Sequence, residues 1–171
     1  MGVWTPVTSL PTGTGRSNLE ALTADSSTAS NVGSDVFIYA LGGGTGASTD
    51  AILVSPGGLL DLIGWDPVDG MSPPRNAYAA ALANNFLFAV GGEGGAAIDT
   101  GSKANICREN EAGCGSPPDL GGWSSLSNIN MQPRAFMGKA VQSGFLYLIG
   151  GIDAAGAVLS STDQSVLGGQ P

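Results

Sequence analysis

Acidic side chains are the groups of this chain best suited to chemistry, because paired carboxylates can cleave glycans as acid, base or nucleophile. Those that cluster or fall in expected loops are Asp61, Asp66, Asp69, Glu93, Glu109 and Glu111. Asp66-Pro67 and Asp69-Gly70 are, however, typical turn sequences, and Glu109-Asn110-Glu111 is typical of a solvated loop tip. We therefore expect turns at these positions and keep a carboxylate-based hydrolase or lyase as a third hypothesis. No EF-hand or repeated-Asp motif indicates calcium.

Histidine is absent from the 171 residues, which removes the commonest general base and metal ligand. Ser-His-Asp and Cys-His catalysis are therefore excluded. The two cysteines, Cys107 and Cys114, bracket a short turn-rich stretch, so we expect a disulfide rather than free thiols if the compartment is oxidising. Structural zinc needs four ligands of Cys or His type, which this chain lacks. The sequence predicts no catalytic residue, no cofactor and no metal.

Composition and charge exclude several classes of partner. The net charge is −8, and Lys103, Lys139 and four arginines form no basic stripe that could neutralise phosphates, so nucleic acid and anionic membranes are poor candidates. The longest apolar region, roughly 77–90, is interrupted by Asn84-Asn85 and is too short for a spanning helix. Few lysines and the expected disulfide favour an extracellular or periplasmic location. Because the first residues resemble no signal peptide, a cytoplasmic location stays open.

The positions of these side chains depend on an internal repeat. An aromatic-x-aromatic-x-aliphatic-Gly-Gly run occurs at 37–43, 86–92 and 145–151. In a strand, alternate residues share a face, so each run is apolar on both faces. Such a strand belongs inside a stack of sheets, and the glycine pair permits a turn or a close backbone approach. With 28 glycines, 10 prolines and only 12% charged residues, the composition also predicts an all-β fold.

Further residues keep register with the glycine pairs. Arg75 and Arg134 each stand sixteen positions before a first glycine, and a tryptophan lies upstream of each arginine. The first glycines are 49 and 59 residues apart (91 − 42 and 150 − 91), near the ~50-residue period of kelch repeats. The repeat positions are Trp4, Arg16, Gly42, Gly43, Trp65, Arg75, Gly91, Gly92, Trp123, Arg134, Gly150 and Gly151.

This pattern of tryptophan, Met-Pro-Arg stretch and Gly-Gly strand resembles the kelch family over nearly the whole chain. The resemblance implies a β-propeller of four-stranded antiparallel blades. Galactose-oxidase-like enzymes share such propellers, but their copper site needs histidines, so that activity is not carried over to this chain. The tryptophans could stack on sugars, although their fixed place in the repeat favours packing between blades.

We predict one domain, 1–171, with an N-terminal strand at 2–8 and blades at about 17–66, 75–125 and 134–161. The third blade is expected to have only three strands, the last at about 156–161, because no tryptophan follows Gly151. Three blades are fewer than the usual four to eight. We therefore expect a partial ring within a larger assembly, or half of a six-bladed ring in which two copies exchange their Trp4 strands.

The function expected from these features is a non-catalytic protein-interaction or structural assembly module. Its partners would be proteins, either a second copy or other subunits. The loops at 23–31 and 103–120, which depart from the repeat, are the candidate contact segments. A carbohydrate-binding, lectin-like propeller is the alternative, with glycan as ligand.

Overall fold

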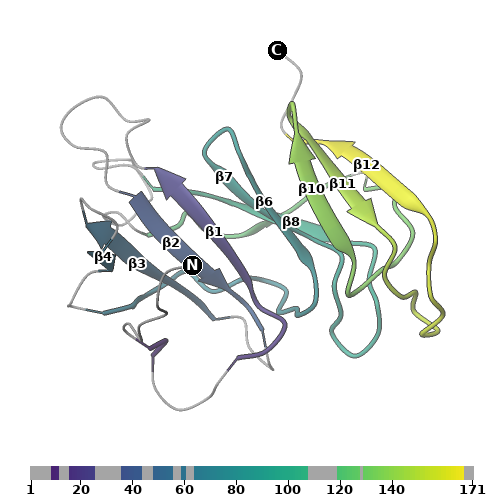
Figure 1. Ribbon diagram of the computed structural model, residues 1–171, viewed down its shortest axis with the longest axis horizontal. Helices are drawn as coiled ribbons and strands as arrows, with labels where there is room; N and C mark the ends of the chain where they lie inside the picture. The colour runs from purple at the N-terminus through teal and green to yellow at the C-terminus, as the bar shows by residue number, and fades with distance from the viewer. Residues whose placement is uncertain are drawn as a thin grey trace, which may run out of the picture.

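Every regular element that the structure describes is a β-strand, and the strands form three antiparallel sheets in chain order (Figure 1). The computed structural model describes residues 9–11, 16–25, 36–43, 48–55, 59–60, 64–107, 119–127 and 129–167. This confirms the all-β prediction, and the three sheets match the three predicted blades. No helix in this part of the chain is long and apolar enough to cross a membrane. The predicted N-terminal strand at 2–8 lies outside the described residues.

The first sheet, blade 1, contains the first copy of the repeat at its second strand. Its strands are β1 (Glu20–Asp25), β2 (Val36–Leu41), β3 (Thr49–Ser55), β4 (Leu59–Leu60) and β5 (Asp66–Val68). Both β4 and β5 pair with β3, so the expected single outer strand is divided into two short ones. A turn-forming Asp66-Pro67 in the outermost strand is tolerated because proline, which donates no hydrogen bond, is confined to sheet edges.

Blade 2 has the regular four-stranded order. It contains β6 (Ala79–Ala83), β7 (Phe86–Val90), β8 (Gly101–Asn105) and β9 (Ser124–Ser125). The β6–β7 hairpin turns at Asn84 and Asn85, both with positive φ, which asparagine tolerates better than most residues.

Blade 3 has three described strands, β10 (Gly138–Gln142), β11 (Phe145–Ile149) and β12 (Thr162–Val166). The predicted third strand at 156–161 is wrong, because this segment is part of the loop that joins β11 to β12. The apolar Val158 bridges Ile152 within that loop instead of extending the sheet. The third blade therefore continues to Val166, beyond the predicted limit of 161, and its last strand is the polar Thr-Asp-Gln-Ser-Val segment.

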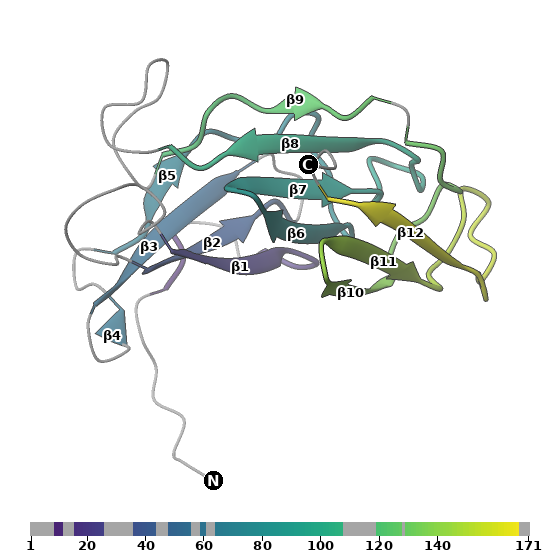
Figure 2. The same cartoon turned by 90° about the horizontal axis from the view of Figure 1, so that it is seen from above.

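The core lies between neighbouring blades, because each repeat strand presents side chains to both sides. In β7, Leu87 and Ala89 pack toward blade 1, whereas Phe88 and Val90 pack toward blade 3. Figure 2, a view from above, shows the sheets succeeding one another in this order from β1–β3 to β10–β12. The prediction that both faces are buried therefore holds for the middle blade.

Candidate functional site

The repeat arginines organise the loop that follows each Gly-Gly pair. Buried Arg75 donates through Nη1 to the carbonyl oxygens of Gly91 at 3.0 Å and Thr100 at 2.8 Å, and through Nη2 to Ser102 Oγ at 3.1 Å. The guanidinium thus joins the end of β7 to the start of β8. Burial lowers the pKa of Arg75 from its usual value. The acceptors compensate its Nη1 and Nη2 donors, whereas its buried Nε has no hydrogen-bond partner among the described residues.

The other two arginines make the same contacts in their own blades. Arg134 Nη1 donates to Gly150 O at 2.9 Å and Ser161 O at 3.2 Å, and its Nη2 lies 2.7 Å from Asp163 Oδ2. Arg16 likewise donates to Gly42 O and Ser48 O and pairs with Asp50. The equivalent acceptors Asp50, Ser102 and Asp163 each stand at the second position of a third strand. These arginines stabilise the blades and do not form a catalytic cluster.

The first glycine of the pair approaches the next blade in two of the three copies. A Cβ on Gly42 would lie 2.8 Å from Arg75 O, and a Cβ on Gly91 would lie 2.8 Å from Arg134 O. The nearest heavy atom to a Cβ on Gly150 is Leu159 O, at 3.3 Å, within the same blade. Among the described residues, blade 3 therefore lacks the neighbour that blades 1 and 2 possess.

Exposed apolar side chains gather on blade 3. The equivalent residues of the three repeat strands are Leu41, Val90 and Ile149, with exposed fractions of 0%, 6% and 49%. All five large hydrophobic residues that are exposed in the described part of the chain belong to the third repeat: Phe136, Val141, Ile149, Val158 and Val166. Of these, Ile149 and Val166 share one face of the sheet, and this face is an uncovered surface of the kind that mediates association.

Trp123 is used for packing between blades. It is half-buried, packs against the core shared by blades 1 and 2, and donates through Nε1 to the carbonyl oxygen of Asp69 at 3.0 Å. Trp65 directly precedes β5, at the equivalent position of blade 1, and Trp4 lies outside the described residues. The packing interpretation therefore fits Trp123 better than sugar stacking does.

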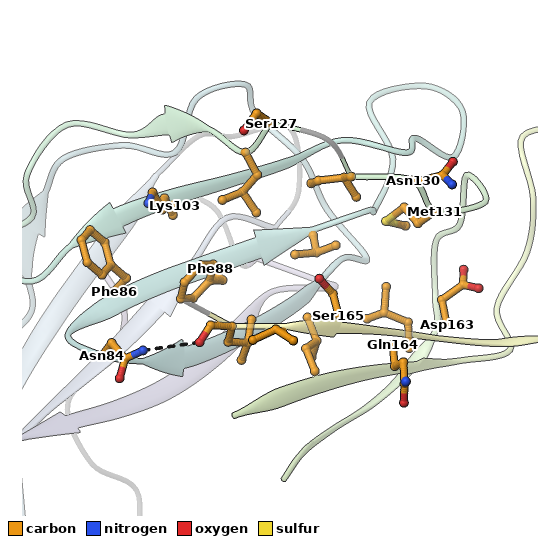
Figure 3. Close-up of a pocket in the computed structure, with 17 residues that line it drawn as sticks. Asn84, Phe86, Phe88, Lys103, Ser127, Asn130, Met131, Asp163, Gln164 and Ser165 are labelled. Atoms are coloured by element: carbon orange, nitrogen blue, oxygen red, sulfur yellow. Dashed lines mark hydrogen bonds between the residues drawn. The ribbon is translucent and has the colours of Figure 1, made fainter. Parts of the chain in front are cut away.

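A cavity of about 790 Å³ lies between blades 2 and 3 (Figure 3). Phe86, Phe88 and Lys103 line it from β7 and β8, and Asp163, Gln164 and Ser165 line it from β12. The ammonium group of Lys103 lies 4.8 Å from the centre of the Phe86 ring. The sequence predicted that blade 3 is incomplete, but gave no sign of a cavity of this size.

The candidate catalytic carboxylates are not brought together by the described structure. Asp66 and Asp69 are exposed at the outer edge of blade 1, and Glu93 lies in the loop after β7. Asp61, Glu109 and Glu111 lie outside the described residues. Among the residues that are described, no group of three His, Cys, Asp or Glu side chains could hold a metal ion.

The predicted disulfide joins Cys107 to Cys114, and the structure describes only Cys107. Cys107 is buried at the end of the third strand of blade 2 and is disulfide-bonded. Cys114 lies outside the described residues, so the Cys107–Cys114 pairing stays a prediction.

Comparison with known proteins agrees with this architecture. Kelch-like protein 13 from Mus musculus is 30% identical over 98 residues, which cover 54% of this chain and 13% of that protein. The proteins of the same name from Bos taurus and Homo sapiens are 29% identical over the same length and also match over only 13% of their own length. A solved structure, described as the structure of YjhT, superposes with a TM-score of 0.54 at 17% identity, covering 69% of this chain and 32% of that one. No protein-family model matches the chain.

Three sheets of one internal pattern, packed against each other in chain order, define a partial β-propeller. Its repeat and the similarity to the Kelch-like protein 13 sequences support a kelch-repeat assignment for the chain.

Proposed function

We propose that this chain is a non-catalytic protein-interaction or structural assembly module whose binding surface is the uncovered face of blade 3. The observation that carries the proposal is the exposure of Ile149, whose equivalents Leu41 and Val90 are buried by the following blade. A kelch propeller also supports a protein-interaction or structural role, because its rigid blades present faces and loops to partners.

The chemistry of this face fits another sheet rather than a charged ligand. Residues directly opposite one another in an antiparallel sheet point to the same side. The register of β10, β11 and β12 therefore places nine residues on the uncovered face: Gly138, Ala140, Gln142, Phe145, Tyr147, Ile149, Thr162, Gln164 and Val166. None of them is charged at neutral pH. An uncharged surface of mixed aromatic and aliphatic character has the composition of a packed interface core.

A second copy of this chain supplies a face of the required kind. The side of blade 1 that faces away from blade 2 presents exposed Ala21 and Thr23 and half-buried Val36 and Ile38. If blade 3 of each copy packs on blade 1 of the other, two copies form a six-bladed ring with two-fold symmetry. Six blades lie within the usual range for propellers, and the closed ring leaves no blade face uncovered.

The test is the mass of the chain in solution. Light scattering and sedimentation should give a dimer of 17.0 kDa protomers for the native sequence. Ile149→Glu places a charge on the uncovered face and should give a monomer. Val158→Glu, at an 86% exposed loop position, is the matched control and should leave the dimer intact. Circular dichroism verifies that both variants fold. A native chain that stays monomeric at all concentrations, or equal effects of both variants, would contradict the proposal.

The described residues give little support to the two alternative functions, a carbohydrate-binding propeller and a carboxylate-based hydrolase or lyase. Trp123 is engaged with Asp69 between blades, which does not favour a lectin-like site built on the repeat tryptophans. Asp66 and Asp69 are exposed at an outer edge, without the enclosed carboxylate pair that glycoside cleavage requires.

A further inference from the structure

We propose that a second copy of this chain binds blade 3 through the backbone of its Arg16 and Asn18, repeating two hydrogen bonds that join blade 3 to blade 2. These two bonds are called the backbone pairing below. The inference rests on the proposed two-copy ring, and it names polar groups in the loops of blade 3 rather than the uncovered face of its sheet. All the groups involved lie in the described part of the chain.

The backbone pairing between blades 2 and 3 involves main-chain groups at and just after a repeat arginine. The amide of Gly92, in blade 2, donates to the carbonyl oxygen of Arg134, in blade 3, at 2.8 Å. The amide of Phe136 donates in the opposite direction, to the carbonyl oxygen of Ala77 in blade 2, also at 2.8 Å. The guanidinium group of Arg134 meanwhile binds acceptors of its own blade. One arginine therefore holds its own blade through its side chain and the preceding blade through its backbone.

The position two residues after each arginine has the same unusual conformation in all three blades. Asn18, Ala77 and Phe136 occupy it, with φ of +57°, +51° and +55°. Positive φ is uncommon outside glycine and is most unfavourable for a bulky residue such as phenylalanine. The amide of Ala77 donates to the carbonyl oxygen of Asn18 at 3.1 Å. The three residues thus form a chain of hydrogen bonds from blade 3 through blade 2 to blade 1, and this shared role explains their shared conformation.

Blade 3 presents the same donor and acceptor without partners. Gly151 is the counterpart of Gly92, and its amide has no acceptor among the described residues. The carbonyl oxygen of Phe136, the counterpart of the Ala77 oxygen, has no donor within the same part of the chain. Phe136 is also 50% exposed. Because buried main-chain groups are almost always hydrogen-bonded, a surface that covers blade 3 has to supply one acceptor and one donor here.

Blade 1 presents the complementary groups. The guanidinium group of Arg16 binds its own blade, as that of Arg134 does. Within the described residues, the carbonyl oxygen of Arg16 has no donor and the amide of Asn18 has no acceptor. Blades 1 and 3 lie on opposite sides of blade 2 (Figure 1), so a second copy supplies the match. Gly151 then donates to Arg16 of the second copy, and Asn18 of the second copy donates to Phe136.

A close approach at Gly150 makes the backbone pairing testable by substitution. A Cβ on Gly91 would lie 2.8 Å from the carbonyl oxygen of Arg134, which is the acceptor of the pairing between blades 2 and 3. In the two-copy ring, a Cβ on Gly150 would meet the carbonyl oxygen of Arg16 of the second copy in the same way. Within one copy, the nearest heavy atom to that Cβ is Leu159 O, at 3.3 Å. An alanine at this position should therefore disturb association more than it disturbs the fold of one copy.

The first test measures the dissociation constant of the dimer by sedimentation over a range of concentrations. Overpacking against a backbone carbonyl should weaken one contact about 30-fold, and two-fold symmetry repeats that contact, so Gly150→Ala should weaken dimerisation about 1000-fold. Gly144→Ala is the matched control. Gly144 lies in the β10–β11 turn with φ of +78°, and nothing lies within 4 Å of an added Cβ. This variant should dimerise like the native chain, and circular dichroism verifies that both variants fold.

Amide hydrogen exchange, followed by NMR, tests the hydrogen bonds themselves. The amides of Asn18 and Gly151 should exchange at least about tenfold more slowly in the native dimer than in the monomeric Ile149→Glu variant. The amide of Phe136 is the internal control. Because it is bonded to Ala77 within one copy, it should be protected in both proteins.

The outcomes separate the backbone pairing from the proposed function. A native dimer in which Gly150→Ala and Gly144→Ala have equal dissociation constants would overturn the pairing. So would a dimer in which Asn18 and Gly151 exchange as fast as they do in the monomer. If that dimer still depends on Ile149, the proposed function stands and only the pairing is refuted. A native chain that never dimerises overturns both.

Discussion

The contact between the first glycine of a repeat and the next blade gives the sharpest test of this architecture. Gly91 and Gly150 occupy the same repeat position with φ of +67° and +63°, so alanine is strained equally at both. The cost of alanine in a left-handed conformation is about 1 kcal/mol. Only at Gly91 does the added Cβ meet a backbone atom of another blade, Arg134 O at 2.8 Å.

The two substitutions should therefore differ in their effect on stability. Overpacking against a backbone carbonyl adds about 2 kcal/mol, so Gly91→Ala should cost about 3 kcal/mol and Gly150→Ala about 1 kcal/mol. Because small proteins are stable by only about 5–15 kcal/mol, the difference is readily measured.

Urea unfolding followed by circular dichroism, at a concentration where the chain is monomeric, measures both values. The m-values should stay unchanged, which shows that the folded states are comparably compact. Equal losses for Gly91→Ala and Gly150→Ala, within about 0.5 kcal/mol, would refute the assignment of Gly91 as a contact between blades.

Three further outcomes are expected. Arg134→Ala leaves the buried end of its loop without its ion pair and should lower the free energy of unfolding by about 3 kcal/mol in urea titrations, whereas a loss below about 1 kcal/mol would show that the loop holds without it. Burial raises the pKa of Tyr39 and Tyr78 above the usual ~10, so the unfolded chain releases these protons first and stability should fall as the pH rises above ~10; thermal melts test this, and a constant melting temperature up to pH ~12 would contradict it. Cys107 should resist alkylation, as judged by intact mass, until the chain is reduced, and labelling without a reductant would contradict the disulfide.

The inner strands of the fold could be read from local sequence because their side chains must be apolar on both faces. Phe86-Leu-Phe-Ala-Val90 illustrates this, since its residues pack alternately toward blades 1 and 3. The outer strands could not be located in the same way. β12 is polar because one of its faces is exposed. The apolar Val158 lies in the preceding loop, where the strand was wrongly predicted.

By itself, the sequence determined the all-β class, the kelch repeat and the absence of histidine chemistry, because each is a matter of residue type and spacing. Only the tertiary structure decided how the repeat positions act. It showed that the arginines bind the carbonyl groups after each Gly-Gly pair, and that Gly150 lacks the contact which Gly42 and Gly91 make. It also placed a cavity beside Ser165. Such contacts join residues far apart in the chain, so they depend on how sheets pack rather than on local pattern.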